Sequence, residues 1–220
     1  MTLKKLTLTA LTVMSLAPAT AHAAPITVDF EDVTESTVSA SATSRSFDFA
    51  GDNSGFLFAT DGTLCGPPCA SNGTRTLLAA GPLFGYSSQV TLTRNGGGTF
   101  VLTGLDAGEM FSGGNPDFAA ARIDYSEFLG GLLVASGSIV LDGIIDGPGG
   151  LPDFQTFSVT GALVDTIRFV GVNSGGNGNN GFSLDNLTIQ DINPIPEPSS
   201  LLLVGLGLAG LAGACRRKAA

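Results

Sequence analysis

Short apolar runs separated by glycine, serine, threonine and asparagine fill the middle of the chain. No helical periodicity persists there over an 11-residue window, whereas the run 154–160 alternates, with Gln155, Phe157 and Val159 on one face. Many short strands with glycine-rich turns favour an antiparallel β-sandwich, and a jelly roll of two packed sheets is the predicted fold. The predicted strands are Ile26–Phe30, Ser46–Ala50, Gly55–Ala59, Ser88–Arg94, Gly98–Thr103, Ala120–Tyr125, Leu132–Val134, Ser138–Leu141, Phe154–Thr160, Thr166–Val172 and Phe182–Ile189.

Two polar stretches are predicted to be loops because of their composition. Glu35–Ser44 is rich in serine, threonine and alanine, and Asn173–Gly181 consists of glycine, asparagine and serine. The 14 phenylalanines all lie in the middle region, mostly within predicted strands, which is typical of a sandwich core. Tryptophan is absent, so a strong aromatic platform for sugar rings is not expected.

The N-terminal segment has the pattern of a secretory signal peptide. Two lysines precede an apolar stretch at 6–17, and Ala21-His22-Ala23 supplies a small-residue cleavage site. An N-terminal anchor helix is the alternative, but the apolar stretch is too short to span a bilayer comfortably. We therefore predict a signal peptide at 1–23, cleaved after Ala23 or Ala24, and an exported sandwich domain at 24–193.

The C-terminal segment has three parts. Pro194–Ser200 is proline-rich, Leu201–Cys215 is apolar and uncharged, and Arg216, Arg217 and Lys218 form a basic end. As a helix the apolar part would cover about 22 Å, short of a hydrocarbon core of ~30 Å. Serines before it, snorkelling arginines after it and local thinning of the bilayer would complete a short transmembrane span. The basic end is expected to stay on the cytoplasmic side.

The order of these parts, with Pro196, Glu197 and Pro198 before an apolar helix and a basic end, resembles the PEP-CTERM sorting signal of Gram-negative envelope proteins. The resemblance covers residues 194–220, with Ile195 where the family usually has valine. It implies export, brief tethering in the inner membrane, and processing by exosortase, a membrane cysteine protease. The processed protein would reach the envelope, the outer surface or the extracellular matrix, and the family is associated with exopolysaccharide and biofilm production. A plain anchor without processing is the alternative.

Charge and histidine content argue against several classes of function. All 19 acidic residues lie between Asp29 and Glu197, where the only basic residues are five arginines, so this stretch has a net charge of −14. A nucleic-acid partner is not expected, because its phosphates would be repelled. The one histidine, His22, lies in the predicted signal peptide, so the mature protein would have none for a catalytic triad or a metal site.

The opening run ITVDFEDV and the closing run GFSLDNLTI resemble the first and last strands of carbohydrate-binding-module-like jelly rolls. In the closing run Phe182 and Leu184 share one phase, while Leu187 and Ile189 have the opposite phase. A bulge near Asp185-Asn186 would turn all four toward the core and re-aim a carboxylate. The resemblance implies a sandwich and, in some relatives, a structural calcium near the paired first and last strands.

Asp29, Glu31 and Asp185 are the candidate calcium ligands, because hard cations prefer carboxylate and carbonyl oxygens. They would converge if the first and last strands lie close together. The alternative is that Asp29 and Glu31 are solvent-facing residues of an alternating strand. No other cofactor is expected.

Cys65 and Cys69 are predicted to form a local disulfide, because they lie in an exported segment and a Gly-Pro-Pro turn separates them. A redox centre is the alternative, but the spacing is C-x₃-C and no basic residue flanks it. A zinc site would need two more soft ligands and could not use histidine.

The expected function is non-catalytic, as a structural or adhesive component associated with exopolysaccharide. The alternative is a carbohydrate-binding module that recognises a surface glycan, for which Tyr86 and Tyr125 are the aromatic candidates. A polysaccharide-active hydrolase or lyase is the third hypothesis. Glu31, Glu109 and Glu127 are candidate members of its acid pair, although no spacing singles them out.

Overall fold

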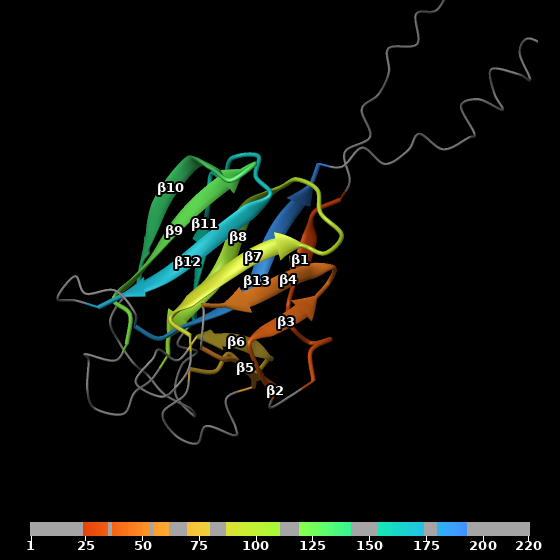
Figure 1. Ribbon diagram of the computed structural model, residues 1–220. Coiled ribbons are helices and arrows are strands. Elements are labelled where there is room, and N and C mark those ends of the chain that lie inside the picture. Colours follow the sequence, from red (N-terminus) through yellow and green to blue (C-terminus); the bar gives the residue numbers. More distant parts are fainter. Residues whose placement is uncertain are drawn as a thin grey trace, which may run out of the picture. The chain divides into compact units, whose positions relative to one another are not determined.

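The computed structural model describes residues 24–34, 37–52, 55–61, 70–79, 87–110, 119–141, 154–173 and 180–192. Within these residues the chain forms 13 strands and no helix, and the strands assemble into two antiparallel sheets (Figure 1). The predicted all-β antiparallel sandwich is therefore confirmed.

Several predictions lie outside the described residues. These are the signal peptide, the disulfide between Cys65 and Cys69, the position of Tyr86, and the C-terminal tail with its apolar segment at 201–215. In the part of the chain that is described, no helix is long and apolar enough to cross a membrane. The transmembrane helix and the disulfide stay predictions.

The two sheets share no strand. The seven-stranded sheet has the order β11-β8-β13-β6-β5-β2, with β1 paired to β13, and the six-stranded sheet has the order β10-β9-β12-β7-β4-β3. The members of the seven-stranded sheet are β1 (Ile26–Val28), β2 (Thr37–Ser39), β5 (Leu57–Thr60), β6 (Thr76–Ala79), β8 (Phe100–Glu109), β11 (Phe154–Ser158) and β13 (Phe182–Asp191). The members of the six-stranded sheet are β3 (Ser41–Ser44), β4 (Phe47–Gly51), β7 (Gln89–Arg94), β9 (Arg122–Leu129), β10 (Leu132–Val140) and β12 (Thr166–Val172).

Strand β13 is the central element of the seven-stranded sheet. One of its sides pairs with β8, and the other pairs first with β6 and then with β1. In the β1–β13 pair Ile26 lies opposite Ile189, so residues 24 and 192 leave the sandwich at the same end of this sheet (Figure 1). The first and last strands therefore do lie side by side, which is the condition set by the calcium hypothesis.

The core between the sheets is built from phenylalanine, leucine, isoleucine and valine. Two edge-to-face ring pairs contribute to it, Phe30 with Phe49 at 4.9 Å and Phe47 with Phe100 at 5.4 Å between centroids. The prediction that phenylalanines form the core is confirmed for the six that are fully buried, which are Phe30, Phe47, Phe49, Phe100, Phe169 and Phe182.

The predicted bulge in the closing strand is confirmed. The register of β13 against β8 shifts between Asp185 and Thr188, and Asn186 adopts a φ of 47°. Because of this bulge, the two pairs of apolar residues that differ in phase all face the core. The four residues, each 0% exposed, are Phe182, Leu184, Leu187 and Ile189.

Other predicted boundaries were wrong. Glu35–Ser44 was expected to be a loop, but it contains β2 and β3, whose polar composition is tolerated because each is the edge strand of its sheet. Strand β6 was missed, because all four of its residues are buried and it shows no alternation. Strand β10 is one strand rather than two, with a bulge between Leu133 and Ala135.

Candidate functional site

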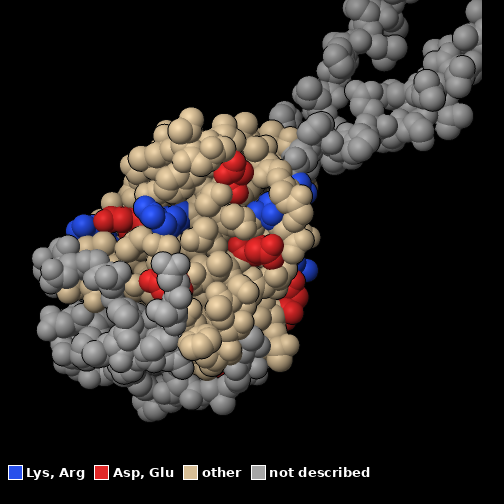
Figure 2. Space-filling view, in the orientation of Figure 1, with Lys and Arg blue, Asp and Glu red and all other residues tan. Residues whose placement is uncertain are grey.

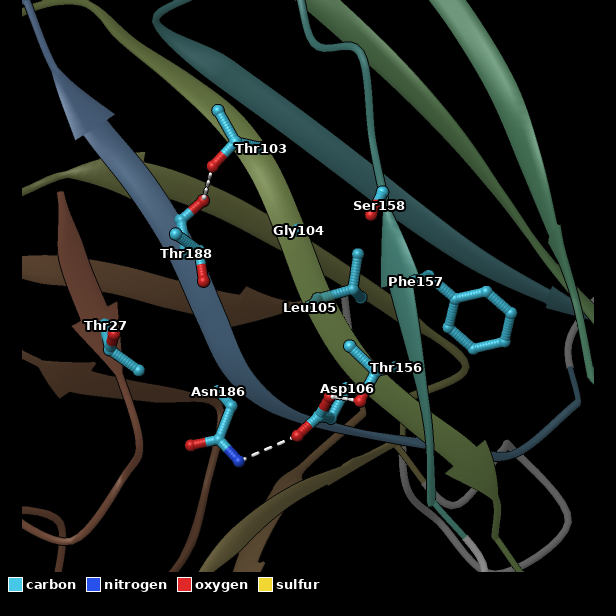
Figure 3. A pocket seen from close by; sticks show the side chains of 10 residues that line it. All are labelled: Thr27, Thr103, Gly104, Leu105, Asp106, Thr156, Phe157, Ser158, Asn186 and Thr188. Carbon is cyan, nitrogen blue, oxygen red and sulfur yellow. Dashed lines mark hydrogen bonds between the residues drawn. The ribbon is translucent and has the colours of Figure 1, made fainter.

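A groove of about 390 Å³ lies on the outer face of the seven-stranded sheet (Figure 3). Four strands contribute to it: β1, β8, β11 and β13. The residues that line this groove are Thr27, Thr103, Gly104, Leu105, Asp106, Thr156, Phe157, Ser158, Asn186 and Thr188.

Strand alternation and the bulge place these side chains on the outer face. In β8, Leu105 and Ala107 are buried in the core, so Asp106 between them points outward. The bulge in β13 turns Asn186 to the same side as Asp106. Gly104, which also lines the groove, lets β11 approach β8 closely, since a Cβ atom there would lie 3.1 Å from the carbonyl oxygen of Phe157.

Hydrogen bonds across neighbouring strands hold the polar groups in position. Thr156 donates from Oγ1 to Asp106 Oδ1 at 2.7 Å, and Asn186 donates from Nδ2 to Asp106 Oδ2 at 2.8 Å (Figure 3). Thr103 Oγ1 donates to the carbonyl oxygen of Thr188 at 3.1 Å. The groove therefore presents a preorganised row of hydroxyl, carboxylate and amide groups.

Asp185 lies beside this row but does not line the groove. It is 0% exposed, and its Oδ2 accepts hydrogen bonds from Asn72 Nδ2 at 2.7 Å and Thr74 Oγ1 at 2.9 Å. Burial raises the pKa of this carboxyl to about 6, against the opposing effect of these hydrogen bonds, and the nearby charge of Asp106 raises it further. Asp185 thus anchors the loop before β6 to the bulge of β13.

The other two candidate calcium ligands have protein partners as well. Asp29 forms an ion pair with Arg45, with 3.0 Å between Oδ2 and the guanidinium nitrogen, and this hydrogen bond holds the pKa of Asp29 below its usual range. Glu31 Oε1 accepts a hydrogen bond from the backbone N–H of Arg75 at 2.8 Å. Glu31 and Asp185 are thus brought to one corner, because they bind the adjacent residues Arg75 and Thr74.

The ion pair and hydrogen bonds of these three carboxyl groups leave few free oxygen positions for a bound cation. Among the described residues no group of three histidine, cysteine, aspartate or glutamate side chains is arranged to hold a metal ion. An ion at Asp29 would have to displace Arg45, and one at Asp185 would have to displace Asn72 and Thr74. The calcium site stays a prediction that a melting experiment can decide.

The candidate acids of the hydrolase hypothesis are poorly placed for a substrate. Glu109 and Glu127 are each 1% exposed, while Glu31 is exposed and bonded to Arg75. Glu127 Oε2 accepts a hydrogen bond from the backbone N–H of Ala162 at 3.2 Å, and burial raises its pKa. None of the three lines the groove.

Tyr125 does not offer a fully exposed ring for sugar stacking. It lies on β9 and packs against the hydrophobic core. Its ring covers Gly137 of β10, because a Cβ atom there would lie 2.5 Å from Tyr125 Cζ. Tyr125 is only partly buried, so its part in glycan binding stays a prediction.

None of the residues that line the groove was predicted from the sequence as a site residue. The conflict of hydrophobic phase in the closing strand located only the bulge, which turns Asn186 outward, while Asp185, the carboxylate that it was expected to re-aim, is buried. Asp106 and Thr156 are 50 positions apart and meet only because β8 pairs with β11. No local pattern marks that pairing in the sequence.

Comparisons with known proteins identify the tail and the fold. Residues 194–218 match the model of the PEP-CTERM protein-sorting motif, so the chain carries the sorting signal that the tail predicted. This motif implies export, transient membrane anchoring and processing by exosortase. No curated protein matches the chain.

Several solved structures align with the sandwich. A DUF4465 family protein from Bacteroides caccae is similar, with a TM-score of 0.53 and 15% identity over 77% of this chain and 100% of that one. An arabinose-bound GH51 α-L-arabinofuranosidase aligns with a TM-score of 0.43 and 13% identity over 78% of this chain and 27% of that one. The CBM32 domain of AlyQ, in complex with 4,5-unsaturated mannuronic acid, aligns with a TM-score of 0.32 and 18% identity over 70% of this chain and 97% of that one. The first of these similarities shows the fold alone.

Proposed function

We propose that the chain is a non-catalytic component of the cell envelope or extracellular matrix that attaches to exopolysaccharide. In this proposal the PEP-CTERM motif delivers the protein, and the groove on the seven-stranded sheet holds the polysaccharide. The observation that carries the proposal is the row of hydroxyl, carboxylate and amide groups in this groove.

The chemistry of the groove supports binding to a polyhydroxylated ligand. Threonine and serine hydroxyls both donate and accept hydrogen bonds, and the Asp106 carboxylate accepts them, which matches the donors and acceptors of a sugar. Asp106 is the one charged residue among the ten that line the groove, so a strongly anionic polymer would be opposed and a neutral one favoured. The groove is shallow and its polar groups are held by neighbouring strands, which suits a segment of an extended chain.

The same geometry favours binding over hydrolysis. A glycosidase needs two carboxyl groups that face the scissile bond, one of them with a raised pKa. The pKa values of Asp185 and Glu127 are raised, but both residues are buried. Both oxygens of Asp106 accept hydrogen bonds, from Thr156 and Asn186. Release of reducing ends from the exopolysaccharide of the producing cells would instead favour the hydrolase or lyase hypothesis.

Glycan binding is tested by blocking the groove. In Gly104→Leu the new side chain would fill the groove, so binding to exopolysaccharide from the producing cells should be lost. Thr91→Leu is the matched control, because Thr91 lies on β7 in the other sheet, and it should bind like wild type. Equal binding by both variants would refute the assignment to this groove. A glycan array separates the two binding hypotheses, since one preferred glycan indicates a recognition module and weak binding to many indicates an adhesive component.

Sorting is tested by fractionation and intact-mass analysis in wild-type cells and in cells that lack exosortase. We expect the wild-type protein to lose residues 1–23 and its C-terminal tail and to appear outside the inner membrane. Without exosortase the tail should be retained and the protein should stay with the inner membrane. Identical masses and locations in both strains would indicate a plain anchor.

A further inference from the structure

Strand β10 is a long and apolar edge strand. It spans nine residues at the end of the six-stranded sheet, and within the described residues only β9 pairs with it. Apolar side chains at both of its ends are exposed, with exposed fractions of 73% for Leu132 and 68% for Val140. Leu133 and Val134 are also exposed. Along its outer side the backbone N–H and C=O groups that do not pair with β9 are available to another strand.

The usual protections of an edge strand are nearly absent here. The sequence of β10, LLVASGSIV, contains no charged residue and no proline. One protective irregularity exists, the bulge at Val134, but it lies near the hairpin turn and leaves Ala135–Val140 regular. At the turn end of the β9–β10 hairpin the nearest charge is the carboxylate of Asp165, which accepts a hydrogen bond from the backbone N–H of Gly130 at 2.6 Å, and Figure 2 shows mostly uncharged surface beside it. This edge is therefore open to strand addition.

We propose that β10 pairs in antiparallel fashion with β10 of a second copy of this chain, which continues the six-stranded sheet across a two-fold axis. An antiparallel pair of identical strands is self-complementary, because a two-fold axis repeats each contact. The axis would pass near Ser136, so the Leu133 end of one copy would meet the Val140 end of the other. Leu133 and Val140 point to the same outer face, because they lie opposite Phe128 and Arg122 of β9, so these two exposed side chains would cover each other.

Charge also favours a second copy at this edge. The stretch between Asp29 and Glu197 has a net charge of −14, so two copies repel over most contacts. An uncharged strand is the place where that repulsion opposes association least. A basic partner would be expected to approach acidic side chains instead, and β10 offers it none.

The surface area that β10 can bury determines how strongly two copies should associate. Nine residues span about 30 Å, and one sheet with its side chains is about 10 Å thick, so each copy would bury about 300 Å². A total of about 600 Å² is below the range of stable, specific interfaces. The dimer should therefore be weak and dependent on protein concentration.

The test is sedimentation velocity on the processed protein recovered from cells, over a concentration series. Wild type should show a sedimentation coefficient that rises with concentration. The double variant Leu133→Lys/Val140→Lys and the double variant Leu133→Glu/Val140→Glu should each stay monomeric, because like charges would meet on the outer face across the axis. An equimolar mixture of the two variants should regain the rise, since opposite charges would then meet.

Val38→Lys is the matched control and should associate like wild type. Val38 is also an exposed apolar residue of an edge strand, but it lies on β2 in the other sheet. A wild type that remains monomeric throughout would overturn the proposal, as would a Lys variant that associates like wild type. Hydrogen exchange provides a second readout in the unmodified protein, with slower exchange of β10 amides at high concentration expected and unchanged exchange refuting the pairing. None of these outcomes depends on glycan binding.

Discussion

At the scale of single residues, Asp185 carries the most unusual electrostatics of the described chain. It sits in the bulge of β13, out of contact with solvent, and holds Asn72 and Thr74 through its carboxylate. A buried carboxyl resists ionisation, which is why its pKa rises to about 6 even with three hydrogen-bond donors around it. Ionisation of this buried carboxyl at neutral pH therefore lowers the free energy of unfolding, while its hydrogen bonds hold the loop before β6 in place.

We expect this cost to appear as a pH dependence of the free energy of unfolding. Between pH 3.8 and about 6 the folded protein keeps a proton on Asp185 that the unfolded chain has released. Stability should therefore fall as the pH rises through this window, by about 3 kcal/mol in total for a shift of this size, and should level off above it. Chemical denaturation at a series of pH values measures the fall.

Asp185→Asn provides the comparison, because an amide does not titrate. The difference in free energy of unfolding between wild type and the variant should change across this pH window and stay constant above about pH 7. The raised pKa of Glu127 lowers stability as pH rises in both proteins, and the lowered pKa values of Asp29, Asp32 and Asp124 act only on the acid side of the window. A difference that is independent of pH would show that folding does not raise the pKa of Asp185.

The calcium prediction belongs to the same corner of the molecule. If calcium binds Asp29, Glu31 and Asp185, it should raise the melting temperature by mass action, and EDTA should reverse the rise. Asp185→Asn should reduce the rise, because it removes a charged ligand. A melting temperature that does not respond to calcium would leave the hydrogen bonds to Arg45, Arg75 and Thr74 as the whole role of these carboxyls.

The candidate site contains one feature that can be predicted from the sequence and one that cannot. The bulge at Asp185-Asn186 was predictable because hydrophobic phase has a strict period of two in a strand, so a break in phase requires an extra residue. The partnership of Asp106 with Thr156 was not predictable, because it follows from which strands become neighbours. The position of the bulge could therefore be predicted from the sequence, but the residues that meet across neighbouring strands could not.

At the scale of elements, the segment that follows β1 ties the two sheets together. On one side Asp29 and Asp32 bind Arg45 in the turn between β3 and β4 of the six-stranded sheet. On the other side the Arg75 guanidinium donates to the carbonyl oxygens of Glu31, at 3.0 Å, and of Val33. Arg75 directly precedes β6 of the seven-stranded sheet, so the segment bridges both layers.

Arg75→Ala should weaken this bridge. The substitution leaves two carbonyl oxygens without their charged donor, and hydrogen bonds to charged groups contribute about 1.5–3 kcal/mol each, so we expect a loss of about 2 kcal/mol in the free energy of unfolding. Arg168→Ala is the control, since the Arg168 guanidinium lies over the ring of the half-buried Phe128, 5.6 Å from its centroid, and loss of this cation–π contact should cost less than about 1 kcal/mol. Equal losses in the two variants would argue against a special role for Arg75.

Edge strands were the elements that the sequence described worst. Strands β2 and β3 have the Ser/Thr/Ala composition of a loop, and this composition is possible because each is the edge strand of its sheet within the described part of the chain. The small residues in the middle of β10 hid its continuity, although Gly137 is required there by the covering ring of Tyr125. Interior strands such as β7 and β12 were predictable, because their burial on the core side enforces alternation.

At the scale of the whole molecule, binding and self-association would use different surfaces. The groove lies on the face of the seven-stranded sheet, while β10 is the edge of the six-stranded sheet. A dimer joined through β10 would carry two grooves, and two linked sites bind a repetitive polymer far more strongly than one. A weak dimer would thus be sufficient for a matrix component that works at high local concentration.

The topology also separates the folded domain from the sorting signal. Strand β13 ends at Asp191, and the matched sorting motif begins at residue 194. The chain order thus places the last central strand just before the signal, so the signal can be removed without disturbing any described strand. We expect a chain that ends at residue 193 to keep the melting temperature of the full-length protein.

A chain that ends at residue 186 should fail to fold. It would lose Leu187 and Ile189, both fully buried, and with them the partners of Val28 and Ile26, so β1 would detach from the sheet. Removing two buried aliphatic side chains of this size costs several kcal/mol, at least about half of the stability of a typical domain. Circular dichroism and thermal melts of the two truncated chains provide the measurement. Cooperative unfolding of the shorter chain would show that β13 is dispensable beyond its bulge, and loss of folding in the longer chain would show that the sorting signal contributes to the fold.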